Sequence, residues 1–187
     1  MQYVKLPTER VAVLIGKDGE TKEFIERRTG AALKIDSETG DVSIDTEHMT
    51  EPFLILKVVD VVKAIGRGFS PEKAFRLFSD DIYFESVDIR DQVGKSQDRL
   101  IQVRSRLIGT GGRTRGVIEE LTSANVSIFG NTVSIIGEIT ALYTAKKAID
   151  MILCGSEHAT VYKFLERKRR EAKLAALEVF DSEPTEE

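Results

Sequence analysis

Two short glycine-containing segments are the residues of this chain best suited to chemistry with a ligand. The first is Ile15-Gly16-Lys17-Asp18-Gly19, and the second is Ile108-Gly109-Thr110-Gly111-Gly112. Glycine has no Cβ, so the backbone of such a loop can come very close to a bulky anion. Where a helix begins directly after the loop, its free N–H groups can face that anion. Both segments therefore predict contact with phosphate groups.

The glycine spacing excludes two better-known phosphate loops. A Walker A loop needs four residues between its glycines and then Lys-Ser or Lys-Thr, whereas Gly112 stands three after Gly109 and is followed by Arg113-Thr114. A dinucleotide-binding G-x-G-x-x-G motif that starts at Gly109 would need glycine where Thr114 stands. Neither a P-loop nor a dinucleotide site is predicted.

Residues suited to catalysis or metal binding are sparse. Cys154 and His158 are four positions apart, but two ligands are too few for a structural zinc site. The run Ser156-Glu157-His158 lacks a nucleophile elbow and an evident oxyanion hole. We find neither paired acidic metal ligands nor a nucleophile beside a base. The sequence therefore predicts a protein that is not an enzyme and that uses no cofactor and no metal.

The two glycine segments belong to an internal repeat. A shift of 93 positions aligns Leu14 to Ile35 with Leu107 to Ile128 without a gap, and ten of these 22 positions are identical. The identical pairs are Leu14/Leu107, Ile15/Ile108, Gly16/Gly109, Gly19/Gly112, Thr21/Thr114, Ile25/Ile118, Glu26/Glu119, Thr29/Thr122, Ala31/Ala124 and Ile35/Ile128. Two copies of one domain are expected.

Each copy has the pattern strand, helix, glycine loop, helix, strand, strand, helix. The predicted strands are 2–6, 32–36 and 41–45 in the first copy, and 82–89, 125–129 and 132–137 in the second. Apolar residues at helical spacing from Leu54 to Ile65 and from Ala141 to Ile152 predict the closing helices. Ser70-Pro71 begins a short connecting helix, and a further helix is predicted from Ala159 to about Val179.

This order of elements is typical of the KH domain, whose loop clamps about four backbone nucleotides of a single strand. Because the closing helix follows the strand pair, both copies correspond to type I. The predicted fold class is α+β, with two KH domains of three strands and three helices each plus a C-terminal helix. The predicted limits are 1–80 for the first KH domain with its connecting helix, 81–156 for the second, 157–180 for the basic helix and 181–187 for an acidic disordered tail.

Charge favours the second copy as the RNA-binding one. The segment from Arg104 to Arg115 holds four arginines and no acid, whereas the segment from Arg10 to Lys22 holds three bases and two acids. Phosphate contacts supply much of the affinity for nucleic acid, so the more positive loop is the expected primary site. The first copy is expected to assist or to bind protein.

The hairpin strand of each copy is expected to supply an apolar floor for the bases. The predicted primary site comprises Arg104, Arg106, Ile108, Gly109, Thr110, Gly111, Gly112, Arg113, Arg115, Ser127 and Ile128. The predicted secondary site comprises Ile15, Gly16, Lys17, Asp18, Gly19 and Lys22. The basic run from Arg167 to Arg170 is interpreted as a solvated helix face and is not assigned to a site.

The resemblance extends beyond the loops to a family. The tandem KH pair, the connection Gly66-Arg67-Gly68-Phe69-Ser70-Pro71 and the end from Ile152 to Leu165 resemble the Dim-two, or partner-of-Nob-one, family over nearly the whole chain. The two well-formed loops make it similar to an archaeal member. The resemblance implies an RNA-binding ribosome-assembly factor at the 3′ end of small-subunit pre-rRNA. The implied partners are the PIN-domain endonuclease that trims this RNA and other small-subunit assembly factors.

Composition and alternatives complete the prediction. With 41% hydrophobic and 31% charged residues, the chain of 187 residues is predicted to be folded, and neither a membrane span nor a signal peptide is expected, which favours the cytoplasm. The alternative function is an exosome-associated KH subunit that guides RNA to a nuclease. Such subunits usually pair one KH domain with a five-stranded barrel, and no barrel pattern is visible.

Overall fold

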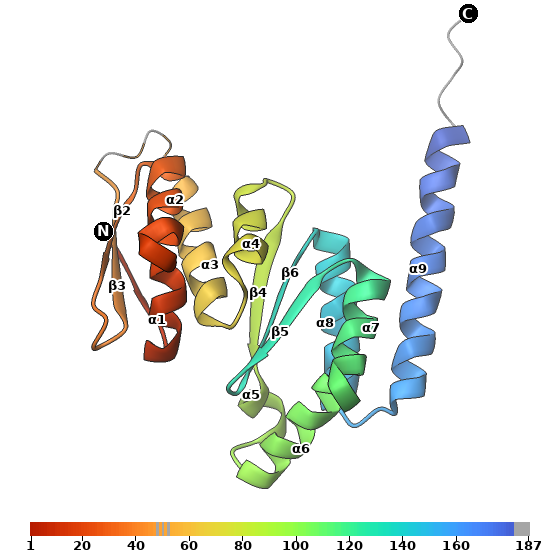
Figure 1. Cartoon of the computed structure of the whole chain (residues 1–187). Coiled ribbons are helices and arrows are strands. Elements are labelled where there is room, and N and C mark those ends of the chain that lie inside the picture. The colour runs from red at the N-terminus through yellow and green to blue at the C-terminus, as the bar shows by residue number, and fades with distance from the viewer. Residues whose placement is uncertain (48, 50, 52, 182–187) are drawn as a thin grey trace, which may run out of the picture.

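The computed structural model describes residues 1–47, 49, 51 and 53–181, and it contains two similar units followed by a long helix (Figure 1). The first unit contains β1 (Gln2–Lys5), α1 (Thr8–Ile15), η1 (Lys17–Gly19), α2 (Glu20–Thr29), β2 (Ala32–Ile35), β3 (Asp41–Asp45) and α3 (Leu54–Gly66). The connection contains α4 (Pro71–Phe75) and η2 (Arg76–Phe78). The α+β class and the two type I KH domains predicted from the sequence are confirmed.

The second unit repeats this order with one addition. Its elements are β4 (Tyr83–Asp88), α5 (Ile89–Val93), α6 (Gln97–Ile108), η3 (Thr110–Gly112), α7 (Arg113–Thr122), β5 (Asn125–Phe129), β6 (Thr132–Gly137) and α8 (Ile139–Leu153). The short helix α5 was not predicted, so this domain has four α-helices where three were expected. Asp88 begins α5, because its carboxylate accepts a hydrogen bond from the N–H of Arg90 at 2.9 Å. Ile89 therefore turns into the core instead of ending β4.

The two sheets have the same topology. Their strand orders are β1-β3-β2 and β4-β6-β5, and all pairs are antiparallel. Ser43 in β3 pairs with Lys34 of β2, and Ser134 in β6 pairs with Ser127 of β5. Lys34 and Ser127 are 93 positions apart, so the two serines take equivalent places. The repeat found in the sequence therefore extends to strand register.

Several identities of the repeat are explained by polar contacts that join the second helix to the sheet. The carboxylate of Glu26 accepts a hydrogen bond from the N–H of Leu33 at 2.7 Å, and that of Glu119 accepts one from Val126 at 2.8 Å. The hydroxyl of Thr122, like that of its counterpart in the first copy, donates to the carbonyl four residues earlier at 2.7 Å. These bonds satisfy buried backbone groups where the helix gives way to the strand.

The second helix of each domain turns threonines toward the core. Thr21, Ile25 and Thr29 are the buried residues of α2, and the equivalent positions are buried in α7. Phe24 is 37% exposed and stacks on Phe75 of α4 at 4.3 Å between ring centroids. Thr29 and Thr122 can be buried because their hydroxyls are bonded to the helix itself.

The outer face of the second sheet packs against the first domain. Ser127 of β5 donates a hydrogen bond to the carbonyl of Arg67 at 2.8 Å, and Ser134 of β6 is fully buried. Ile136 of β6 belongs to the hydrophobic core of the first domain. In the first sheet the same face carries Tyr3, which is 74% exposed. The two sheets therefore play different roles although they have the same topology.

The last helix, α9 (His158–Asp181), packs along α7 and α8 on the side away from the first domain (Figure 1). Its N-terminal part is anchored in the second core by Val161 and Leu165. The predicted acidic tail lies outside the described residues except for Asp181, with which α9 ends. None of the helices in the described part of the chain combines the length and apolar character needed to cross a membrane.

The domain contact predicts a specific effect of Gly68→Ala. Gly68 has a φ of +96°, and an added Cβ would lie 2.7 Å from Ser127 Oγ and 3.2 Å from Phe129. Backbone strain and crowding together should lower the free energy of unfolding by about 2–3 kcal/mol in urea denaturation. Gly155→Ala is the control, because φ is +94° there and nothing lies within 4 Å of its Cβ position. That variant should lose about 1 kcal/mol, and equal losses in the two variants would contradict the interpretation.

Candidate nucleic-acid interface

The two glycine loops have the same backbone conformation. φ is +80° at Gly16 and +72° at Gly109, and the two loops close with φ of +86° at Gly19 and +81° at Gly112. The loops differ one position earlier, where Asp18 has a φ of +53° and Gly111 a φ of +60°. Aspartate tolerates this left-handed region better than most residues. The difference between the loops therefore lies in side-chain charge and not in backbone shape.

A threonine hydroxyl beneath each loop explains why its first glycine is invariant between the copies. A Cβ on Gly16 would lie 2.4 Å from Thr21 Oγ1, and one on Gly109 would lie 2.3 Å from Thr114 Oγ1. Both threonines are buried, at 8% and 2% exposure respectively. Only glycine fits at this position, and it allows the loop to pack directly against the start of the following helix. Its outer surface is then free to meet a backbone of sugar and phosphate.

The second loop has a support that the sequence analysis missed. Tyr162 of α9 lies with its hydroxyl 3.1 Å from Thr114 Oγ1, and His158 Nε2 lies 2.9 Å from the carbonyl oxygen of Arg106. Thr21, the equivalent residue of the first domain, makes no such side-chain hydrogen bond among the described residues. The sequence offered one signal, because positions 158 and 162 are four apart and share a helix face. Tertiary packing alone shows that this face meets the loop.

Two of the arginines counted in the charge of the two loop segments, Arg10 and Arg106, hold the fold together. Arg106 donates to the carbonyl oxygen of Ile152 at the end of α8, at 3.1 Å, and to that of Ser156 beyond the helix, at 2.5 Å. Arg10 does the same for α3, with bonds of 2.8 Å to Ile65 and 2.7 Å to Phe69. Burial lowers the pKa of Arg10, although Glu9 acts in the opposite direction. Arg106, which was predicted in the RNA site, therefore uses N–H groups of its guanidinium to bind helix-end carbonyls, and we do not include it among the proposed RNA ligands.

The remaining arginines keep the charge difference between the loops. Without the two structural arginines, the second segment retains a charge of +3 and the first a charge of 0. Arg113 is exposed and makes no hydrogen bond or salt bridge among the described residues. Arg104 donates to the carbonyl of Gly130 at 3.1 Å, from α6 to the turn between β5 and β6. Arg115 lies 3.9 Å from Glu119. An exposed ion pair at this distance is weak, so the arginine can still attract a phosphate.

Lys17 and Lys22 of the first loop each have an acidic neighbour. Lys22 lies 3.9 Å from Glu26, the equivalent of the Arg115 pair in the second domain. Lys17 and Asp18 are adjacent and exposed. A phosphate at the first loop would therefore meet both signs of charge.

The isoleucines predicted for the apolar floor differ in exposure. Ile108 is 39% exposed, while Ile128 and Ile15 are half-buried and pack against their cores. Leu33 and Val126 of the same two hairpin strands are buried in the cores.

Ser127, which was also predicted in the primary site, lies on the opposite face of β5 from Ile128, at the contact with the first domain, because neighbouring residues of a strand point to opposite faces. Its hydroxyl donates to Arg67 and is not part of the groove.

The loop residues Thr110 and Gly111 are exposed, and a cavity of about 550 Å³ opens behind them, between α6, the loop and α9. Among the described residues, no group of three or more His, Cys, Asp and Glu side chains is placed to hold a metal ion. The arrangement offers backbone amides, hydroxyls and one unpaired guanidinium. Groups of these kinds are the usual donors to nucleic-acid phosphates.

Comparison with known proteins identifies both halves of the chain. A model of the eukaryotic type KH domain (KH domain type I) matches residues 83–170, and a KH domain model matches residues 1–50. A KH domain-containing protein of Methanocaldococcus jannaschii is 44% identical over 181 residues, which cover 96% of this chain and 79% of that protein. Pre-rRNA-processing protein PNO1 of Candida glabrata is 26% identical over 131 residues, which cover 70% of this chain and 50% of that protein.

A solved structure shows the same arrangement of domains. It is the crystal structure of a complex of a/eIF2alpha, aDim2p and rRNA from Pyrococcus horikoshii, in which the matching chain is 47% identical. The TM-score is 0.85, and the match covers 91% of this chain and 94% of that chain. With KH models on both halves and a relative that is 44% identical over 96% of this chain, this chain belongs to the archaeal branch of the tandem KH-domain family that includes PNO1 and Dim2p.

Proposed function

We propose that this protein binds single-stranded RNA in the groove of its second KH domain and assists the processing of small-subunit rRNA near its 3′ end. The observation that carries the proposal is the second glycine loop, where exposed Thr110 and Gly111 stand beside unpaired Arg113 with no acid in the segment. The C. glabrata relative is named a pre-rRNA-processing protein, and the P. horikoshii structure contains rRNA. These names support rRNA as the RNA.

The primary ligand residues of this proposal are those of the predicted primary site other than Arg106 and Ser127. They are Arg104, Ile108, Gly109, Thr110, Gly111, Gly112, Arg113, Arg115 and Ile128. The loop amides and arginines would hold phosphates, and the two isoleucines would contact bases. The first loop would have a secondary role, because Asp18 repels phosphate beside Lys17.

The protein would work as a non-catalytic factor in the cytoplasm. It would present the RNA to the PIN-domain endonuclease that trims it, together with other small-subunit assembly factors. An exosome subunit with a five-stranded barrel is not favoured, because the strands in the described part of the chain form two three-stranded sheets.

The loop proposal predicts that Thr110→Asp/Gly111→Asp loses RNA binding. Two carboxylates at the phosphate contact should weaken binding of RNA from the 3′ end of small-subunit rRNA at least tenfold, or about 1.4 kcal/mol, in a fluorescence titration. The fold should tolerate the change, because Asp18 already occupies the equivalent backbone conformation in the first loop. Lys17→Asp is the matched control and should have a smaller effect. A larger loss in the control would move the primary site to the first domain.

The two classes of arginine predict opposite results for two glutamine variants. Arg113→Gln should leave the melting temperature unchanged and lower the slope of log affinity against log salt by about 0.7, because one phosphate contact is lost. Arg106→Gln should destabilise the protein by about 2 kcal/mol, because it leaves helix-end carbonyls without their donors. Thermal unfolding and salt titrations measure both. A melting temperature that falls only in Arg113→Gln would reverse the assignment.

The absence of catalysis is also testable. Incubation of the pure protein with labelled RNA and magnesium should leave the RNA intact, because the described residues offer no group of three or more His, Cys, Asp and Glu side chains that could hold a metal ion. Cleavage at a defined position that disappears in Thr110→Asp/Gly111→Asp would show an enzyme.

A further inference from the structure

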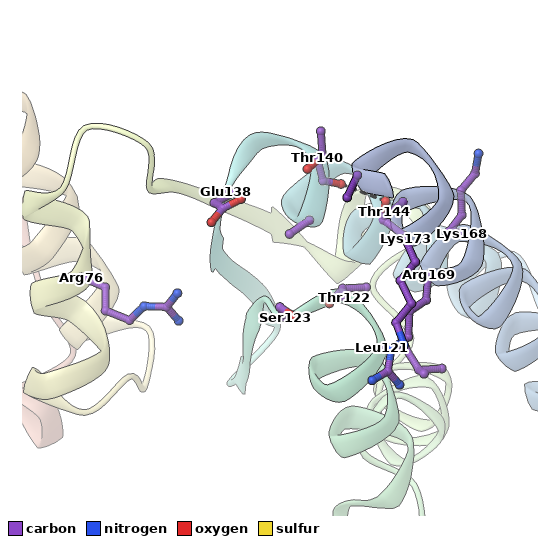
Figure 2. A pocket seen from close by; sticks show the side chains of 13 residues that line it. Arg76, Leu121, Thr122, Ser123, Glu138, Thr140, Thr144, Lys168, Arg169 and Lys173 are labelled. Carbon is purple, nitrogen blue, oxygen red and sulfur yellow. Dashed lines mark hydrogen bonds between the residues drawn. The ribbon is translucent and has the colours of Figure 1, made fainter. Parts of the chain in front are cut away.

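A second basic surface lies at the other end of α7, away from the glycine loop. A trough of about 540 Å³ runs over the end of α7 and the start of α8, and we call it the α7–α9 trough. Figure 2 shows Arg76 of η2 on one side, Arg169 and Lys173 of α9 on the other, and Ser123 and Glu138 between them. The trough therefore joins the connecting segment of the first domain to the C-terminal helix.

The charge of the trough is mostly unpaired. Of its four basic residues, Lys168 is bonded to Glu171 at 2.7 Å, and Arg76 uses one N–H to bond Asn125 at 2.6 Å. Arg169 and Lys173 form no salt bridge with any described side chain. They stand four residues apart on one helix face, and like charges at this spacing repel each other. An anion between them would remove that repulsion, and Glu138 is the one acid that lines the trough.

The backbone at Ser123 gives an independent indication. Ser123 ends α7 with a φ of +63°, in the left-handed region that glycine adopts without cost. In the first copy the equivalent residue is glycine, Gly30, with a φ of +72°. The second copy therefore keeps a side chain in a conformation that disfavours one, and that side chain places an exposed hydroxyl in the trough. Strained residues of this kind concentrate at binding sites.

The hydroxyl of Thr140 adds a further hydrogen-bonding group at the start of α8. Hydroxyls and arginines together are the usual donors to nucleic-acid phosphates. The basic groups are spread from one side of the trough to the other, which suits an extended chain of phosphates better than a single small anion. α7 has ten residues and so spans about 15 Å from the glycine loop to the trough.

We propose that the α7–α9 trough binds the phosphate backbone of RNA that extends beyond the groove of the second KH domain. This proposal rests on the function proposed above and adds a second RNA contact to it. Arg169, Lys173 and Arg76 supply the charge, and Ser123 and Thr140 supply hydroxyl donors. The basic run of α9, interpreted from the sequence as a solvated face, then divides into a trough side and an outer side.

The test compares two pairs of charges on the same helix. Arg169→Gln/Lys173→Gln removes the trough charges, and Lys163→Gln/Arg170→Gln removes two charges from the side of α9 that borders Met151 and Phe164. Each variant is titrated with an RNA of about four nucleotides, which fills one KH groove, and with one of about 20 that extends beyond it. For the longer RNA, the trough variant should lower the salt slope by about 1.4, because two phosphate contacts are lost.

The control pair should leave the slope for the longer RNA unchanged, and both pairs should bind the short RNA like the unchanged protein. Glu138→Gln should tighten binding of the longer RNA only. Equal salt slopes for the two pairs of variants with the longer RNA would overturn the trough proposal. That result is also the one expected if the trough binds an acidic protein and not RNA. If the unchanged protein binds neither RNA, or if Thr110→Asp/Gly111→Asp binds as well as it does, the proposed function itself fails.

Discussion

The close approach of Gly109 to the hydroxyl of Thr114 is the constraint on which the proposed RNA-binding surface depends. A buried threonine lies directly beneath the first glycine of each loop, and an added Cβ would lie 2.4 Å from its Oγ1 in the first copy and 2.3 Å in the second, which is too close for any side chain. This contact sets the position of the loop relative to the helix that follows it. In the second domain the hydroxyl of Tyr162 lies within hydrogen-bonding distance of the hydroxyl of Thr114, so α9 supports the loop from behind. The loop can then offer its amides without reorganisation when a ligand binds.

Arginine has two separate tasks in this fold, and its geometry explains both. The planar guanidinium can bond two carbonyl oxygens at once, which makes Arg10 and Arg106 suitable for the ends of α3 and α8. The same geometry suits phosphate where the side chain remains unpaired, as at Arg113. Arg10 and Arg106 are not at equivalent positions of the repeat. Each nevertheless lies on the first long helix of its domain and binds carbonyl oxygens at the C-terminal end of the last helix, α3 or α8. Counting charges along the sequence mixes these two tasks.

The two domains differ in the segments that pack against their sheets and their glycine loops. The outer face of the second sheet carries Ser127 and Ser134, which are small enough for the first domain to pack closely against them. The equivalent face of the first sheet carries exposed Tyr3 and Lys34. The C-terminal helix packs on α7 and α8 of the second domain, where it supports the loop and forms one side of the α7–α9 trough. The asymmetry concentrates positive charge on the second domain.

The sequence by itself determined the repeat, the order of the elements, the type I KH fold and the position of both loops. These features depend on local periodicity and on a loop conformation that requires glycine at fixed positions. The sequence also placed β5 and β6 at their observed limits. Tertiary structure decided which groups remain free: it assigned Arg106 to helix-end carbonyls, turned Ser127 to the domain contact and brought Tyr162 to the loop. It also opposed Arg169 to Arg76 across the trough. The reason is physical, since a side chain is available to a ligand only if no group distant in sequence already satisfies its hydrogen bonds or charge, and such partners leave no local pattern.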